Sequence, residues 1–147
     1  MGHYCSLLLV LLFLCVASSN SISTKVIEVD IICKGASNPS YCSNLLNSKP
    51  GGAKGVSLVD LAQYTIDVLN GNWVNSTSSR LLVVEKDLKL GQYLDMAKAI
   101  SEIMQYTLHC RDSLHKSDID PLLLQYVDVF RQGVEVLEVL SKNLSLG

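Results

Sequence analysis

An all-α fold is the class that the sequence predicts, and two features of the residue pattern support it. Apolar residues recur at steps of three and four over long stretches after Ser57, which is the spacing of a helix with one buried face. Only short polar or Pro-containing breaks separate these stretches, and short connections between amphipathic helices favour an antiparallel bundle. No alternating strand pattern competes with the helices.

The first 21 residues have the pattern of a secretory signal peptide. Residues 7–17 read LLLVLLFLCVA, an apolar run of eleven residues, too short to span a membrane but within the range of a signal-peptide core. Small residues follow, so we expect cleavage between about Ser18 and Ser23. An uncleaved membrane anchor is the alternative. We expect residues 22–147 to form a secreted domain that does not enter a membrane.

If the domain is secreted, its cysteines are expected to form disulfides. Cys5 and Cys15 belong to the signal peptide, so the domain keeps Cys33, Cys42 and Cys110. Thiols tend to pair in an oxidising compartment, and three cannot all pair within one chain. The residues between the first two are rich in turn formers, which indicates a tight connection closed by a Cys33–Cys42 disulfide. Cys110 is then expected to stay free.

The first half of the domain shows clear helix boundaries. A short helix is predicted through Leu45 and Leu46, and Lys49-Pro50-Gly51-Gly52 ends it. The glycines of PGGAKG lack the spacing of a phosphate-binding loop, so we interpret them as a linker. Ser57, followed by an acidic residue three positions later, predicts the N-terminal cap of the next helix. That helix carries Leu58, Leu61, Ala62, Ile66, Leu69 and Trp73 at helical spacing and meets a polar stretch at residues 75–79.

Two long helices are predicted in the second half. One runs from about Lys86 to Leu108, and a break at residues 118–121 precedes the other. The first is expected to bury Leu90, Leu94, Ala97, Ile100, Met104 and Leu108, and the second Leu123, Val127, Phe130, Val134, Leu137 and Leu144.

Candidate chemistry is sparse, and we expect the protein not to be an enzyme. Lysine and arginine number 12 and acidic residues number 14, with no basic patch of the kind that a nucleic-acid-binding protein shows. His109, Cys110, Asp112 and His115 are close in sequence but have no standard zinc spacing, so neither a metal nor another cofactor is expected. No group is present to orient a Cys–His pair, and the carboxylates are expected on solvated helix faces.

Two sequons mark candidate glycosylation sites, Asn75 and Asn143. Asn75 lies in polar surroundings, which favours modification. Asn143 overlaps the apolar pattern of the final helix, which disfavours it.

The opening of the domain carries a specific motif. Residues 32–42, ICKGASNPSYC, place two cysteines around an Asn-Pro turn, with Leu, Ser and Pro following at 45–50, and this resembles the opening of plant invertase and pectin methylesterase inhibitors. Three later stretches are also similar to family motifs: LVDLAQYTIDV at 58–68 to the first bundle helix, LGQYLDMAKAISEI at 90–103 to the helix of the third cysteine, and HCRDSL at 109–114 to the fourth-cysteine motif.

The resemblance implies a four-helix bundle with an N-terminal helical hairpin and a function in stoichiometric enzyme inhibition. The implied partner is pectin methylesterase or, alternatively, invertase, and the implied location is the cell wall or, alternatively, the vacuole. The NPSYC form of the hairpin resembles the esterase inhibitors more. A shortened family member with a structural role or no inhibitory role is a further hypothesis. A lipid carrier ranks last, since the plant lipid-transfer framework uses eight cysteines.

The sequence departs from the family pattern in two places. Gln92 or Tyr93 occupies the position of the third cysteine, so Cys110 lacks its implied partner. After Tyr106 a helix-length segment is missing, which predicts an incomplete bundle. We then expect Leu90, Leu94, Ala97 and Met104 to be partly uncovered, as well as part of the seam at Val127, Phe130 and Val134. Either self-association or a marginally stable monomer should result.

Overall fold

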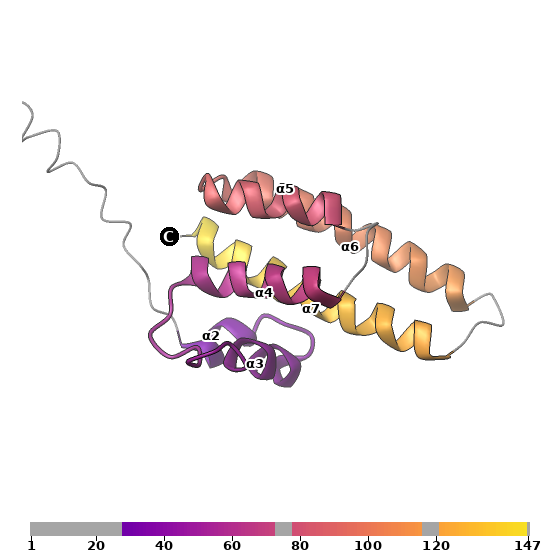
Figure 1. The fold of residues 1–147 in the computed structure, drawn as a ribbon, viewed down its shortest axis with the longest axis horizontal. Coiled ribbons are helices and arrows are strands. Elements are labelled where there is room, and N and C mark those ends of the chain that lie inside the picture. Colours follow the sequence, from indigo (N-terminus) through magenta and orange to yellow (C-terminus); the bar gives the residue numbers. More distant parts are fainter. Residues whose placement is uncertain (1–27, 73–77, 116–120, 147) are drawn as a thin grey trace, which may run out of the picture.

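The computed structural model describes residues 28–72, 78–115 and 121–146, and this part of the chain is all-helical. The all-α prediction is therefore confirmed. The helices are α2 (Val29–Cys33), α3 (Pro39–Asn47), α4 (Leu58–Asn72), α5 (Ser78–Lys89), α6 (Tyr93–His115) and α7 (Pro121–Ser145) (Figure 1). The predicted signal peptide and Asn75 lie outside the described residues.

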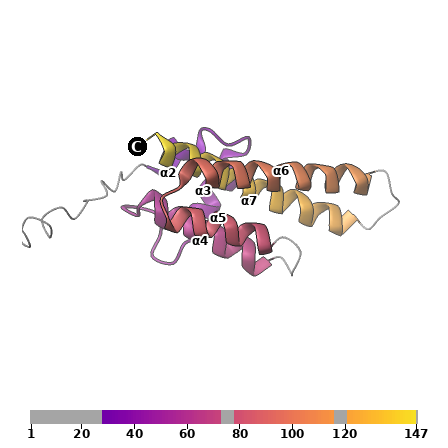
Figure 2. The ribbon, with the colours of Figure 1, turned by 90° about the horizontal axis from the view of Figure 1, so that it is seen from above.

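The four longer helices pack in the order in which they follow one another. Each of α4, α5, α6 and α7 contacts the next, and α7 returns to contact α4. The α2–α3 pair packs on α7, and α3 also contacts α4 (Figures 1 and 2). The centre of the core is fully buried and consists of Leu61, Ile66, Leu81, Val84, Met96, Ile100, Leu137 and Leu140.

The predicted boundaries of the first helices are confirmed. The short helix through Leu45 and Leu46 is α3. Ser57 caps α4 as expected: its Oγ accepts a hydrogen bond from the backbone N of Asp60 at 3.1 Å and donates one to the Asp60 carboxylate at 2.7 Å. Gly51 and Gly52 have φ values of 85° and 76°, so the linker uses conformations that other residues rarely adopt.

The prediction of a single helix from Lys86 to Leu108 is wrong. Gly91 has a φ of 68°, a left-handed conformation common just after a helix ends, and the chain turns there between α5 and α6. Lys86 therefore belongs to α5 and Leu108 to α6. The apolar spacing continues across the turn through Leu90, so the pattern alone did not reveal the break.

The buried face of α6 also differs from the predicted face. Met96, Ile100, Ile103 and Thr107 are buried at steps of three and four, whereas Leu94 is 73% exposed. Only Ile100 belongs to both the predicted and the observed face. Because the helix starts at Tyr93, the residues before the turn do not set its register.

The seam of α7 matches the prediction over most of its length, but it is not left open. Val127, Phe130 and Val134 are buried, so the expectation that a missing helix would uncover them is wrong. The reason is that both α4 and α6 pack against α7, while α5 joins α4 to α6 on the other side. Leu90 and Leu94 are exposed because they lie at the α5–α6 turn, and not because a missing helix leaves a core unfilled.

Candidate functional site

In the α2–α3 hairpin, the residues of the Asn-Pro motif have clear structural roles. Asn38 is the N-cap of α3, and its Oδ1 accepts a hydrogen bond from the backbone N of Tyr41 at 3.1 Å. Pro39 follows at the first helical position, where its missing N–H has no helical partner to lose. The Asn-Pro pair therefore both ends the loop and starts the helix.

A disulfide closes the hairpin at its base. Cys33 and Cys42 are bonded, their Cα atoms are 5.6 Å apart, and both residues are buried. This is the pairing that the short turn-rich separation predicted. The two helices are too short to be stable alone, so the bond holds them together where little apolar surface can.

Polar side chains of α7 clamp the loop of the hairpin. The Glu135 carboxylate accepts two hydrogen bonds from Ser37, from its backbone N at 2.6 Å and from its Oγ at 2.7 Å. The Gln132 Oε1 accepts a third, from Asn38 Nδ2 at 2.7 Å. The loop is therefore fixed to a helix nearly 100 residues further along the chain.

Tyr41 adds a contact from the helical side of the hairpin. Its hydroxyl donates to the backbone O of Val129 at 3.3 Å. Burial raises the pKa of the Tyr41 phenol, because the phenolate loses hydration there. The neutral hydroxyl is thus the form that the hairpin–α7 contact favours.

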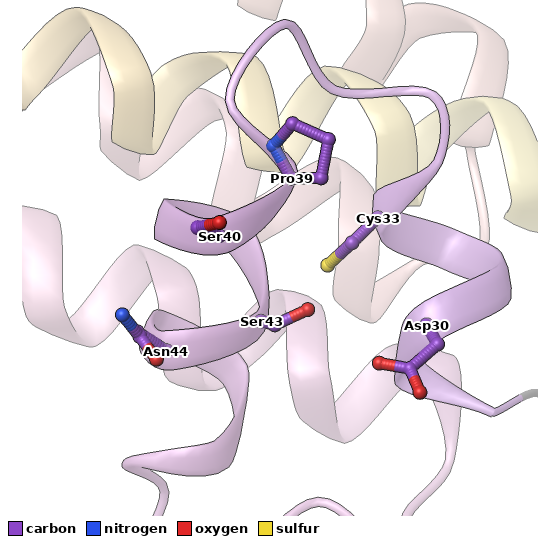
Figure 3. A pocket seen from close by; sticks show the side chains of 6 residues that line it. All are labelled: Asp30, Cys33, Pro39, Ser40, Ser43 and Asn44. Carbon is purple, nitrogen blue, oxygen red and sulfur yellow. The ribbon is translucent and has the colours of Figure 1, made fainter.

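An open polar groove runs along the outer side of the hairpin (Figure 3). It is shallow, has a volume of about 400 Å³ and is lined by Asp30, Cys33, Pro39, Ser40, Ser43 and Asn44. One carboxylate, two hydroxyls and one amide can accept or donate hydrogen bonds to a docked surface. The sulfur in the groove belongs to the Cys33–Cys42 disulfide and is therefore not a free thiol.

The other candidate residues do not form a site with the groove. His109, Cys110, Asp112 and His115 all lie on α6, and Cys110 is an exposed free cysteine. Within residues 28–72, 78–115 and 121–146, no group of three or more His, Cys, Asp or Glu side chains could hold a metal ion. None of the helices described there is long and apolar enough to cross a membrane.

Asn143 lies within α7, where it is half-buried and donates from Nδ2 to the backbone O of Val139 at 2.8 Å. A glycan would be joined to this same nitrogen, where it would replace one of the two amide hydrogens and would have to fit at a half-buried position of the helix. Asn75 lies outside the described residues.

Sequence reasoning missed the residues of α7 that hold the hairpin. Glu135 was expected on a solvated face, yet its side chain is only 17% exposed. Asp87 is likewise buried, at 7%. The helical spacing of Gln132 and Glu135 beside the apolar seam was the only available signal, and it does not distinguish a solvated residue from one that meets a loop.

The implied position of a third cysteine is inconsistent with this fold. Tyr93 and Cys110 lie on the same continuous helix, 17 residues apart, which corresponds to roughly 25 Å at about 1.5 Å per residue. A disulfide requires Cα atoms within about 7 Å. A cysteine at Gln92 or Tyr93 therefore could not pair with Cys110 in this structure.

Comparison with known proteins adds no relative: no protein-family model, no curated protein and no solved structure matches this chain.

Proposed function

We propose that the protein is a secreted inhibitor of pectin methylesterase that acts by stoichiometric binding in the plant cell wall. The observation that carries the proposal is the structure of the ICKGASNPSYC segment. This segment resembles the opening of such inhibitors, and here it folds as a disulfide-closed hairpin that is clamped to α7. Its characteristic residues each have a structural role, which supports a binding module held in one shape.

The groove of the hairpin supports binding through its polar lining. A rigid surface loses little conformational freedom when it docks, so its hydrogen bonds contribute more to affinity. The Cys33–Cys42 disulfide is also compatible with an oxidising, extracellular compartment. Removal of residues 1–21 and a glycan on Asn75 belong to the same proposal, and N-terminal sequencing and glycosidase treatment of secreted protein would test them.

One observation favours a second candidate, a shortened family member with a structural role or no inhibitory activity. The continuous α6 places Cys110 out of reach of the position where its family partner would lie. An invertase inhibitor remains the alternative within the inhibitor class.

The deciding experiment titrates the purified protein against a fixed amount of plant pectin methylesterase and, separately, of invertase. We expect esterase activity to fall linearly and to reach its minimum at about one equivalent when the enzyme concentration exceeds the dissociation constant. Invertase activity should not change. Full esterase activity at a large excess of the protein would contradict the proposal, and loss of invertase activity alone would replace it with the alternative.

A pair of variants would locate the contact. Ser43→Arg places a long cation in the groove, while Ser101→Arg makes the same change on the exposed side of α6. If the groove contacts the enzyme, the first variant loses inhibition and the second retains it. Equal inhibition by both would place the contact elsewhere on the molecule.

A further inference from the structure

Helices α6 and α7 project beyond the ends of α4 and α5 (Figures 1 and 2). Large apolar side chains are exposed on and next to the projecting part: Leu122 at 59%, Tyr126 at 64%, Tyr106 at 57% beside Arg80 of α5, and Val129 at 44%, whose backbone O accepts from Tyr41 of α3. The exposed free Cys110 lies among them in the chain. We call these five residues the open face.

On α6, the open face continues the side that α5 covers. Arg80 of α5 pairs with Glu102 and donates to the Tyr106 hydroxyl at 3.3 Å, with its guanidinium 4.6 Å from the ring centroid. Cys110 follows Tyr106 by four residues and Leu114 follows by eight, so both lie on the same side of the helix. Beyond the start of α5, this side is exposed or half-exposed.

On α7, the open face continues the side that α4 covers. Gly133 lies so close to α4 that an added Cβ would be 2.6 Å from Leu69 Cδ2. Val129, Tyr126 and Leu122 precede Gly133 by four, seven and eleven residues, which places them on the same side. A shallow hollow of about 160 Å³ lies along Leu122, Gln125, Tyr126 and Val129.

Both stripes therefore lie on the side of the α6–α7 pair that the α4–α5 layer covers elsewhere. All five residues of the open face are uncharged. Charges beside this face are paired within the chain: Arg80, which lies over the Tyr106 ring, pairs with Glu102, and Arg111 Nε is 2.8 Å from Asp128 Oδ1 in an ion pair between α6 and α7. A second open face would meet no like charge, whereas a strongly charged partner would find no complementary group.

We propose that the open face binds a second copy of this chain. A twofold axis relates the two copies. The α6–α7 pair of one copy covers the open face of its partner, on the side that the α4–α5 layer covers further along the same helices. Side chains of this size at roughly half exposure offer on the order of 600 Å² per copy, or roughly 1,200 Å² in total, which is the lower limit of specific interfaces. An interface at this lower limit is typical of weak, reversible association.

This inference does not depend on the proposed inhibitor function, and its test uses no enzyme assay. The full chain, produced in a secretory host, is examined by sedimentation equilibrium over a wide concentration range without added oxidant. We expect a reversible monomer–dimer equilibrium that persists in Cys110→Ser, because the contact is non-covalent. A protein that stays monomeric up to several hundred micromolar, or a dimer that disappears in Cys110→Ser, would overturn the proposal.

Matched arginine variants locate the interface. Tyr126→Arg places a cation in both halves of the open face and should weaken dimerisation at least tenfold. Leu94→Arg changes a more exposed residue outside this face and should leave the equilibrium unchanged. Circular dichroism and thermal melting establish that both variants are folded, and Val129→Glu serves if Tyr126→Arg is not. Equal dimerisation of Tyr126→Arg and the parent protein, or equal loss in Leu94→Arg, would contradict the assignment.

Alkylation of Cys110 gives a second readout. Docking covers the thiol, so its rate of reaction with a maleimide should fall as protein concentration rises through the dissociation constant. The same rise in concentration should not slow the reaction in Tyr126→Arg. A rate independent of concentration in the parent protein would show that Cys110 lies outside the interface and would refute the open face as defined.

Discussion

The middle and the N-terminal part of α7 meet their surroundings in opposite ways. Towards the middle and C-terminal part of α7, Gln132 and Glu135 hold a loop by three hydrogen bonds, and a disulfide closes the hairpin behind it. Towards the N-terminal part, Tyr126 and Val129 face outwards beside the end of α6. One helix thus carries a polar contact with a disulfide-closed hairpin at its middle and an exposed apolar surface nearer its N-terminus.

The difference shows how a small domain can fix a segment that has little core of its own. Helices α2 and α3 have 5 and 9 residues, so they bury only a few apolar side chains. Directional bonds and a cross-link compensate for the missing apolar area. The projecting helices are long enough to be stable through contact with each other, so their outer side can stay uncovered.

Removal of the disulfide should have the largest effect on this comparison. In the double variant Cys33→Ala/Cys42→Ala, loss of a loop closed over ten residues should lower the free energy of unfolding by about 2.5–3 kcal/mol. Urea denaturation measures the change. Cys110→Ala is the control at the other end of the molecule and should shift the value by less than about 0.5 kcal/mol, because the residue is exposed. Similar losses in the two proteins would mean that the hairpin is not held by its cross-link.

Glu135→Ala should have the next largest effect. It removes the acceptor of two hydrogen bonds from Ser37 and should lower the free energy of unfolding by about 2 kcal/mol, the range for bonds to a charged group. Glu138→Ala is the matched control, since its pairing with Lys142 is more exposed and should contribute less than about 1 kcal/mol. If chemical denaturation gives equal changes for both, the clamp does not stabilise the native state.

The pH dependence from Tyr41 should be the smallest effect. Burial raises the pKa of its phenol, so the native state holds the proton more tightly than the unfolded chain does. Stability from this source is complete below pH about 10 and is lost as the pH rises above it. The free energy of unfolding, measured by urea titration, should therefore fall less steeply between pH 9 and pH 11 in Tyr41→Phe than in the parent protein. Parallel curves for Tyr41→Phe and the parent protein would refute the assignment.

The sequence predicted the features that depend on neighbours along the chain. The α3 helix, the Ser57 cap and the Cys33–Cys42 bond each follow from residues within about ten positions of one another. The turn at Gly91 was missed because Leu90 continues the apolar spacing across it, and with it the register of α6 was missed as well. A helical pattern identifies the buried face of a helix only when its first residue is known.

The candidate site was predictable only in part for the same reason. The hairpin motif located the groove approximately, but neither Glu135 nor Gln132 carries a local signal for contact with Ser37 and Asn38. Their partners lie more than 90 residues away in the chain. The sequence pattern on the polar side of α7 is the same whether a loop or water covers that side. The exposure of Tyr126 could not be predicted from the sequence of α7 either, because it depends on where α4 ends.

The clamp between Ser37 and Glu135 also sets an order for events during synthesis. Cys42 is made only nine residues after Cys33, so in a chain that enters an oxidising lumen, as proposed, the hairpin could close before the rest of the chain is made. Glu135 follows Ser37 by 98 positions, which at about 5–20 residues per second means a delay of roughly 5–20 seconds. In such a chain, a hairpin that is oxidised during this interval would be cross-linked before Glu135 exists to bind its loop.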